Sequence, residues 1–436
     1  MHFKKSIFIF YFLLFKFSSV LAQNVSPAFS NIKIVNDKAK KTLVIEYDVM
    51  DPDDQYLTVN VDLISKKGLV ISGIEMTNDY GASVAVGQKK KIYCDYSKSV
   101  TTTQPVSVRL TANDHHEIDV KKLIEQVNVE NLKKDLIFIE GKRFPIDEKG
   151  AKHHVEVREL IKNRFAEHEL FVSLQDSAIN SFKIQNIIGD KIGSNKLDQH
   201  YILCAHYDAY YGSPGADDNA SGVAGLLEVI RILKPYNFEN SVKFIGFDLE
   251  EDNSLGSRAY TLGKSNEISK TLGVINFDMI GYFSEKSNSQ LVPEGFDKLF
   301  PEAYQKVASN NFKGDFAVIN YNPLSVSLKD VFQKSASLYV PGFSTIALDA
   351  SVTENINPDL SASDHLSFWN VGVKAIHVGD GGASRNVHIN KKGDKSNLIN
   401  YDYMAKVVQA TIATIAKLAV INSTVIYQEP VTIEVN

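Results

Sequence analysis

The residues best suited to chemistry in this sequence are a histidine and several acids that each follow a short apolar run. His206 directly follows the apolar run 201–205, and Asp208 comes two residues later. If that run is a strand, alternation places both side chains on one face, where Asp208 can accept a hydrogen bond from the imidazole and orient it. A single histidine at a strand end is more often a hydrogen-bonded loop residue than a metal ligand, so other motifs must support this one.

A second motif, Gly-Ala-Asp-Asp-Asn-Ala-Ser-Gly at 215–222, contains Asp218 and precedes a segment with helical periodicity. Asp and Asn are good helix caps, which is the simplest role for them. Capping requires one such residue, whereas this segment has three in succession between glycines that allow a close turn. We therefore expect a further role for Asp218.

Acids also follow two later apolar runs. The segment 248–252, which includes Glu250 and Glu251, has four acids that repel one another unless a positive charge lies among them. An exposed acidic loop is the alternative. Asp278 interrupts an apolar run, so we expect it to be partly buried and to need a partner, for which a metal ion is the simplest choice. Further imidazoles are available from His365, His377 and His388.

Together with His206, these acids match the ligand set of a zinc hydrolase that uses imidazole and carboxylates. The sequence has only two cysteines, Cys94 and Cys204, which lie far apart in what we expect to be different domains. Neither a disulfide framework nor a thiolate metal cluster is therefore available. A metal site must use histidine and acidic side chains.

In these motifs the chain resembles the secreted zinc peptidase family that includes the bacterial leucyl aminopeptidases, aminopeptidase Y and glutamate carboxypeptidase. The glutaminyl cyclases are relatives of this family. The resemblance extends from about residue 141 to the last helical segment. It rests on the segments 206–208, 215–222, 250–251, 277–279 and 363–365. Several motifs match in the right order, which makes the resemblance specific.

The resemblance implies that Asp218 bridges two zinc ions. His206 and Asp278 would complete one zinc site, and Glu251 with a late histidine would complete the other. Glu250 would be the general base rather than a ligand. Two Zn²⁺ ions, three carboxylates and a bridging hydroxide sum to zero charge, and a neutral site is much less costly to bury.

The last zinc ligand is where this sequence departs from the family pattern. The family places it in a His-Thr-x-x-Asp-Thr stretch, whereas the matching segment here, 387–394, is longer and lacks the threonine. We assign the ligand to His388. Asp364 matches a position that lines the active site in the family, its neighbour His365 is a candidate for substrate contact or packing, and Met279 is a candidate for the substrate side-chain pocket. We expect His377 to be a packed core residue.

The sequence predicts two domains, and the candidate site residues lie in the second. Short alternating runs between 28 and 112 predict an antiparallel β-sandwich of immunoglobulin or fibronectin type. After residue 135, apolar runs alternate with helical segments, which predicts an α/β domain with a largely parallel sheet flanked by helices, as in zinc aminopeptidases, and with its chemistry at the carboxyl ends of the strands. The expected boundaries are a signal peptide at 1–22, the sandwich at 23–115, a linker at 116–135, the catalytic domain at 136–422 and a tail at 423–436.

Two acidic segments in the first part of the chain are also candidate ligands. The turn 51–54 contains three aspartates, but it lacks the glycine and the distal glutamate of a calcium loop, so we expect a solvent-exposed hairpin. The segment 114–117, Asp-His-His-Glu, lies in a polar connector and is interpreted as a solvated linker.

The composition and the N-terminus limit the partners and the location. Among the 436 residues, 44% are hydrophobic and 23% are charged, and a net charge of −5 leaves no basic stripe for nucleic acid. Two lysines, an apolar stretch and a small-residue end at Ala22 predict a cleaved signal peptide and export to the periplasm or beyond the cell. A retained anchor is the alternative, and Gln23 excludes a lipid-modified cysteine there. No later segment is apolar enough to span a membrane.

The sequence therefore predicts an exported metallopeptidase with two zinc ions, most simply an aminopeptidase, because a free α-amine of a peptide substrate suits an acid-rich site. A glutaminyl cyclase with one zinc ion is one alternative. An inactive binding protein on the same fold is another, although such proteins lose ligands and this chain retains them. A serine hydrolase is disfavoured because Gly-x-Ser-x-Gly does not occur.

Overall fold

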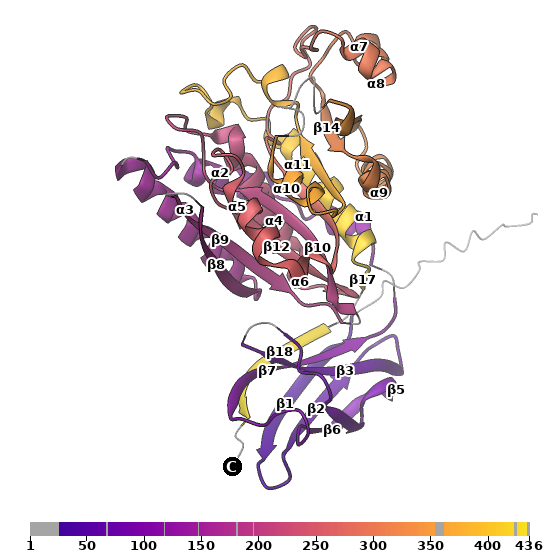
Figure 1. The fold of residues 1–436 in the computed structure, drawn as a ribbon. Coiled ribbons are helices and arrows are strands. Elements are labelled where there is room, and N and C mark those ends of the chain that lie inside the picture. Colours follow the sequence, from indigo (N-terminus) through magenta and orange to yellow (C-terminus); the bar gives the residue numbers. More distant parts are fainter. Residues whose placement is uncertain are drawn as a thin grey trace, which may run out of the picture.

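The computed structural model consists of an antiparallel β domain and an α/β domain that lie end to end (Figure 1). It describes residues 26–66, 69–116, 118–146, 148–179, 182–194, 196–353, 362–422 and 425–433. The expected signal peptide at 1–22 lies outside the described residues. Within them, every helix is too short or too polar to cross a membrane.

The β domain contains two four-stranded sheets. One has the order β1-β2-β6-β4 and the other β18-β7-β3-β5. Alternate residues of β2 and β3 face a shared core, as Leu43 and Val59 do, and both are fully buried. The predicted antiparallel domain is therefore present, and the immunoglobulin or fibronectin type stays a prediction. The strands are β1 (Ala28–Asp37), β2 (Thr42–Met50), β3 (Tyr56–Ser65), β4 (Glu75–Asn78), β5 (Gly81–Ala85), β6 (Gly87–Asp95), β7 (Gln104–Asn113) and β18 (Val425–Ile433).

The C-terminal segment differs from the expected tail. Its strand β18 pairs along β7, from Val425 opposite Ala112 to Ile433 opposite Gln104. Ile433 is fully buried in the core of the β domain, which explains why the segment is held as a strand. The chain therefore completes its first domain with its last described residues.

The expected linker also contains regular structure. Helix α1 (Val120–Ile124) and helix α2 (Val129–Ile139) begin within 116–135. Both bury apolar residues, Leu123 and Leu132 among them, in the main core of the α/β domain. The α/β domain therefore begins earlier than the sequence pattern suggests.

The α/β domain is built on an eight-stranded sheet with the order β15-β14-β16-β13-β10-β12-β9-β8. The four central strands, β16, β13, β10 and β12, are mutually parallel. Antiparallel pairs flank them on both sides, since β9 pairs antiparallel with β12 and β8, and β14 pairs antiparallel with β16. The sheet is thus mixed rather than largely parallel, partly because β8 and β9 form a hairpin. The strands are β8 (Phe171–Ile179), β9 (Phe182–Lys191), β10 (Lys196–His206), β12 (Asn240–Phe247), β13 (Thr271–Phe277), β14 (Phe316–Tyr321), β15 (Ser344–Asp349) and β16 (Ala375–Gly379).

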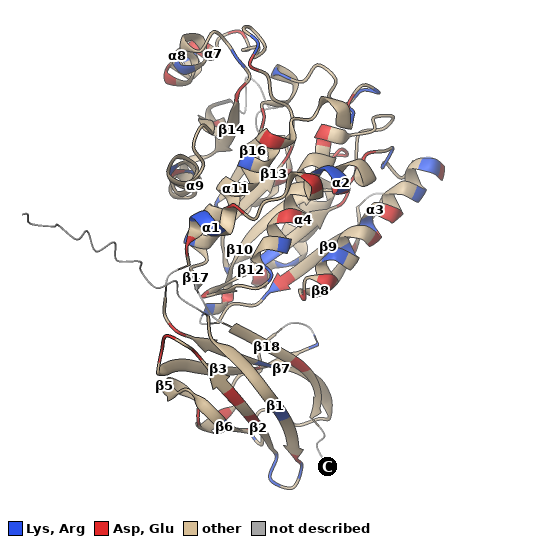
Figure 2. Cartoon of the chain, turned by 180° about the vertical axis from the view of Figure 1, so that it is seen from behind, with Lys and Arg blue, Asp and Glu red and all other residues tan. Residues whose placement is uncertain are grey.

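Helices cover both faces of this sheet. Leu203 and Ala205 of β10 belong to the core under α2, α4 and α11, whereas Ile202 and Cys204 belong to the core under α5 and α10. Charged residues of both signs alternate along the outside of α3 (Figure 2). The helices are α3 (Glu148–Glu167), α4 (Gly222–Leu233), α5 (Leu255–Gly263), α6 (Ser265–Ile268), α7 (Phe296–Leu299), α8 (Pro301–Ser309), α9 (Val326–Tyr339), α10 (Asp364–Trp369) and α11 (Tyr401–Leu418), and two short strands, β11 (Asn237–Phe238) and β17 (Ile421–Asn422), pair with each other.

Candidate metal centre

The candidate site lies where three neighbouring parallel strands end. His206 is the last residue of β10, Glu250 follows β12 and Asp278 follows β13. The register pairs His206 with Phe247 of β12 and Ala205 with Phe277 of β13, so all three strands end at one edge of the sheet. This edge is where parallel sheets place their functional groups.

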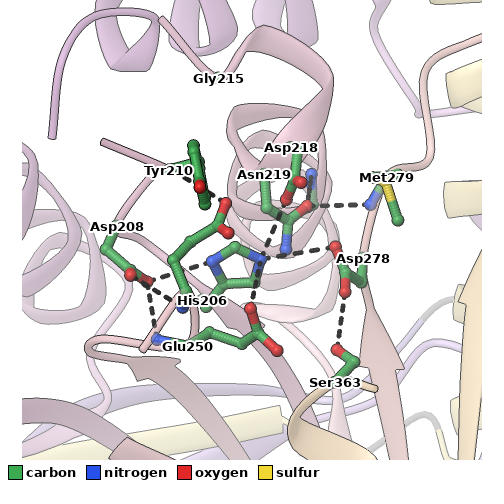
Figure 3. A network of polar contacts seen from close by, with 12 residues as sticks. His206, Asp208, Tyr210, Gly215, Asp218, Asn219, Glu250, Asp278, Met279 and Ser363 are labelled. Atoms are coloured by element: carbon green, nitrogen blue, oxygen red, sulfur yellow. Dashed lines mark hydrogen bonds and ion pairs between the residues drawn. The ribbon is translucent and has the colours of Figure 1, made fainter. Parts of the chain in front are cut away.

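Three side chains meet at that edge as a compact donor cluster (Figure 3). His206 Nε2 lies 3.3 Å from Asp218 Oδ1 and 3.4 Å from Asp278 Oδ1. A tetrahedral zinc ion with bonds of about 2.0–2.1 Å requires neighbouring donor atoms about 3.3 Å apart. His206, Asp218 and Asp278 are all buried, and their spacing fits one zinc ion.

Asp208 positions His206 and the loop that carries Glu250 and Glu251. Its Oδ1 accepts hydrogen bonds from His206 Nδ1 at 3.1 Å and from the Glu250 amide at 3.0 Å, and its Oδ2 accepts from the Glu251 amide at 3.1 Å. Burial acts to raise the pKa of Asp208, but the hydrogen bond and charge of His206 hold the pKa below its ordinary value. With Nδ1 as the donor to Asp208, loss of the Nε2 proton leaves a lone pair of His206 that faces the donor cluster.

Two neutral side chains fix the other donors. Asn219 donates to Phe277 O at 2.8 Å and accepts from the Met279 amide at 3.2 Å, which ties the Asp218 turn to the end of β13. Ser363 Oγ donates to Asp278 Oδ2 at 2.7 Å. The other oxygen of Asp278 therefore faces His206.

The turn before Asp218 depends on Gly215 and Arg143. Gly215 has φ +58°, and a Cβ at this position would lie 2.4 Å from Asp218 O. The buried guanidinium of Arg143 donates to Gly215 O at 2.9 Å and to Tyr207 O at 3.0 Å, so it holds this turn against the end of β10. Burial lowers the pKa of Arg143 to about 10, which leaves the group charged at neutral pH beside the acids of the site.

Glu250 lies beside the donor cluster rather than within it. Its Oε2 is 3.9 Å from His206 Nε2, and its Oε1 accepts a hydrogen bond from Ser254 Oγ at 3.1 Å. Burial raises the pKa of Glu250 well above its ordinary value, and the nearby charges of Asp278 and Asp364 add to this effect. A carboxyl group with a raised pKa next to a metal site has the properties of a general base.

Glu251 is held close to the cluster without joining it. Its Oε1 accepts a hydrogen bond from the Tyr210 amide at 2.9 Å. Burial and then the charge of Asp218 raise the pKa of Glu251 well above its ordinary value. The described residues that form the three-donor cluster are His206, Asp218 and Asp278, so Glu251 stays a candidate for a second site.

His388 lies on a loop that is attached to the Asp218 turn. The side chain of Asn386 donates to Asp217 Oδ2 at 2.8 Å, and the carboxylate of Asp394 accepts from the amides of Asp217 and Asp218 at 3.0 and 3.1 Å. His388 itself is half-buried between these anchor points. The ring of His388 lies against Gly393 of the same loop, outside the three-donor cluster of the described residues.

The remaining candidates lie around the cluster. Asp364 is fully buried, neither of its carboxyl oxygens makes a hydrogen bond of ordinary geometry, and burial raises its pKa to about 7. The ring of His365 lies 4.6 Å from that of Trp369 and 5.3 Å from that of His377, within a buried group. Met279 is half-buried, with its side chain against Gly382.

Sequence reasoning gave no role to three residues that hold the site together, namely Asn219, Ser363 and Asp394. Asn219 and Ser363 belong to motifs that were recognised for their neighbours. Asp394 had a usable signal, since it stands in the segment that matches the His-Thr-x-x-Asp-Thr pattern, six residues after His388. Its role depends on contacts with backbone amides far away in the sequence, which side-chain types do not predict.

Comparison with known proteins decides the family. The sequence pattern of the family described as "Peptidase family M28" matches residues 186–415. This segment is more than half of the chain and includes every proposed ligand. The chain belongs to peptidase family M28. This membership confirms the resemblance to the zinc aminopeptidase group and the predicted class of enzyme, a zinc metallopeptidase.

Individual relatives of this M28 peptidase match over different lengths. The protein YfbL of Escherichia coli (strain K12) is 29% identical over 269 residues, covering 58% of this chain and 77% of the relative. Aminopeptidase YwaD of Bacillus subtilis (strain 168) is 37% identical over 122 residues, which are 28% of this chain and only 27% of that enzyme. The second match is therefore confined to a part of each protein.

A solved structure agrees with the fold. The LapA aminopeptidase of Legionella pneumophila superposes with a TM-score of 0.53 and 17% identity, covering 69% of this chain and 73% of that protein. At this identity the likeness establishes the fold alone. The α/β domain of this M28 peptidase thus has the zinc aminopeptidase fold that the resemblance implies, with a mixed sheet in place of the expected largely parallel one.

Proposed function

We propose that this protein is an exported aminopeptidase that uses two zinc ions to hydrolyse N-terminal residues from peptides. The observation that carries the proposal is the cluster of His206, Asp218 and Asp278, whose donor spacings of 3.3 and 3.4 Å suit a tetrahedral zinc ion. Asp208 orients the imidazole of this cluster, and Glu250 lies next to it as the base.

A zinc ion held by His206, Asp218 and Asp278 would supply a Lewis acid that polarises the peptide carbonyl and lowers the pKa of a nearby water molecule. Glu250 takes the proton of the attacking water and later returns it to the leaving amine. Its position 3.9 Å from His206 Nε2 places it within reach of a water molecule at the donor cluster. Ser254 holds one oxygen of Glu250, so the other is directed at the reaction.

The second zinc ion is assigned to Asp218, Glu251 and His388. Two observations support this set: after burial, the charge of Asp218 raises the pKa of Glu251, and the His388 loop is anchored on the backbone of Asp218 through Asp394. Asp218 has two carboxyl oxygens and one of them belongs to the first cluster, so it is suited to bridging. Metal analysis of the purified protein is expected to find two zinc ions per chain.

Cleavage at the N-terminus follows from the charge of the site. A free α-amine is a cation, and Glu250 and Asp364, acids of the site that are not assigned as zinc ligands, favour its binding at this edge of the sheet. We assign the lining of the substrate pocket to Met279 and Asp364, with His365 packed behind. The relatives named aminopeptidases from Bacillus subtilis and Saccharomyces cerevisiae agree with this specificity.

A peptide library with free and acetylated N-termini tests the proposal. Mass spectrometry of the products should find single residues removed from free N-termini and none from acetylated ones. Cleavage at internal bonds or at the C-terminus would contradict the aminopeptidase assignment.

A glutaminyl cyclase with one zinc ion is the second candidate, because His206, Asp218 and Asp278 are the one cluster of three donors that the described residues assemble at this edge of the sheet. One zinc ion in a fully active protein, with conversion of N-terminal glutamine and no peptide hydrolysis, would favour it. Export is tested separately, since the mature protein should begin near residue 23 when its N-terminus is sequenced.

A further inference from the structure

Two acidic segments of the β domain lie together in the structure. Asp51 and Asp54 belong to the turn between β2 and β3, and Asp114 follows β7. The register of β3 and β7 pairs Thr58 with Asn113, so the start of β3 lies beside the end of β7. The turn and Asp114 therefore meet at the end of the domain where the chain leaves for α1.

The three carboxylates form a compact set of oxygen donors. One oxygen from each of Asp51, Asp54 and Asp114 lies within 4.8 Å of the others. Asp51 and Asp114 are only 7% and 6% exposed, so solvent screens their mutual repulsion poorly. Three negative charges at this spacing are stabilised by positive charge among them.

Asp51 provides a second and independent observation. Its Oδ1 accepts hydrogen bonds from the amides of Asp53 and Asp54 at 2.9 and 3.0 Å, which fixes the side chain. Its Oδ2 is buried and has no hydrogen-bond partner. A buried carboxylate oxygen without a partner is costly, and a bound cation removes that cost.

A neighbouring histidine does not balance the cluster. His116 Nε2 lies 2.9 Å from Asp54 Oδ2. A protonated imidazole carries one positive charge, whereas the three carboxylates carry three negative charges. A divalent cation compensates the cluster more completely.

We propose that Asp51, Asp54 and Asp114 bind a calcium ion. Calcium prefers six to eight oxygen donors and accepts carboxylates from separate segments, with carbonyl groups and water completing its shell. Zinc prefers nitrogen and sulfur donors, and magnesium requires near-octahedral geometry. The ligands come from two distant segments, which is why neither segment matches a calcium-loop pattern. Calcium fixes the connector at the point where it leaves the β domain.

Equilibrium dialysis of the zinc-loaded full chain against radioactive calcium tests this site. We expect one calcium ion per chain, with a dissociation constant of about 10⁻⁴–10⁻³ M as in other extracellular modules. Asp51→Asn and Asp114→Asn should each weaken binding at least tenfold. Asp37→Asn, an equal charge change on an exposed hairpin of the same domain, should bind calcium as the wild type does.

Asp218→Asn separates this site from the zinc centre, because it alters only the α/β domain and should leave calcium binding unchanged. If Asp51→Asn does not fold, Asp54→Asn replaces it, since the Asp54 side chain is 29% exposed and its substitution disturbs less packing. Absence of calcium uptake at about 10 mM, undiminished uptake by the variant of Asp51 or Asp54, or loss of uptake in Asp218→Asn would overturn the proposal.

Discussion

Replacing Asp208 with asparagine tests how a buried carboxylate organises the metal centre. In the structure, Oδ1 accepts from His206 Nδ1 and the Glu250 amide, and Oδ2 accepts from the Glu251 amide. An asparagine side chain has one acceptor oxygen, so it can keep the two Oδ1 hydrogen bonds while its NH₂ group faces the Glu251 N–H. Asp208→Asn therefore loses one negative charge and at least one hydrogen bond.

The size of the effect follows from those contacts. A hydrogen bond to a charged group contributes about 1.5–3 kcal/mol. Partners of metal-bound histidines typically account for about 10–100-fold in metal affinity. We therefore expect the zinc affinity of Asp208→Asn to fall by about 10–100-fold, or about 1.4–2.8 kcal/mol.

Competition with a chromophoric zinc chelator at fixed pH measures this loss. Asp252→Asn is the matched control, because it removes a negative charge from the same loop, where the Asp252 side chain accepts a hydrogen bond from its neighbour Asn253. The control should keep wild-type affinity. If Asp208→Asn also binds zinc as tightly as the wild type, Asp208 does not orient His206 for metal binding.

Two further predictions concern histidines. His388→Ala should lose one zinc ion and nearly all activity. The ring of His365 packs against Trp369, so His365→Ala should keep both ions and change mainly KM or kcat. Atomic emission measures the zinc content, and the reverse metal contents would show that the last ligand is misassigned. His200 is buried within β10, six residues before His206, and burial lowers its pKa to about 4, with the nearby charge of Lys243 adding to the effect. Because an unfolded histidine has a pKa near 6.5, only the unfolded state gains this proton as the pH falls from about 6.5 to about 4, so the histidine lowers stability over this window by up to about 3 kcal/mol. His200→Gln should flatten the pH dependence of the urea midpoint in that window, and an unchanged slope would mean that His200 is not held neutral.

The sequence predicts the α/β domain, and it places the candidate ligands at one edge of the sheet because the chemistry-bearing residues follow buried strands. His206 and Asp278 each end an apolar run, and parallel strands must bring such ends together. The mixed sheet was not predicted, since a continuous apolar run looks the same in a parallel and an antiparallel pair. Strand β18 was not predicted either, because its partner β7 lies more than three hundred residues earlier in the chain.

The supporting contacts of the site are less predictable than the candidate ligands. Asp394 acts by accepting hydrogen bonds from the backbone amides of Asp217 and Asp218, and any acid at the right point of a loop can do this. The acidic cluster of Asp51, Asp54 and Asp114 was interpreted as two solvated segments, because each segment alone lacks the pattern of a calcium loop. Only the register of β3 and β7 brings them together.

The most direct test of the central claim is the turnover of zinc-loaded Glu250→Gln on a peptide with a free N-terminus. The substitution keeps the shape of the side chain and leaves His206, Asp218 and Asp278 in place, but it removes the group that accepts the proton. We predict zinc content equal to that of the wild type and a loss in kcat of about 10²–10⁴-fold or more. Near-normal turnover with a full complement of zinc would contradict the account, because Glu250 would then not be the general base of the reaction.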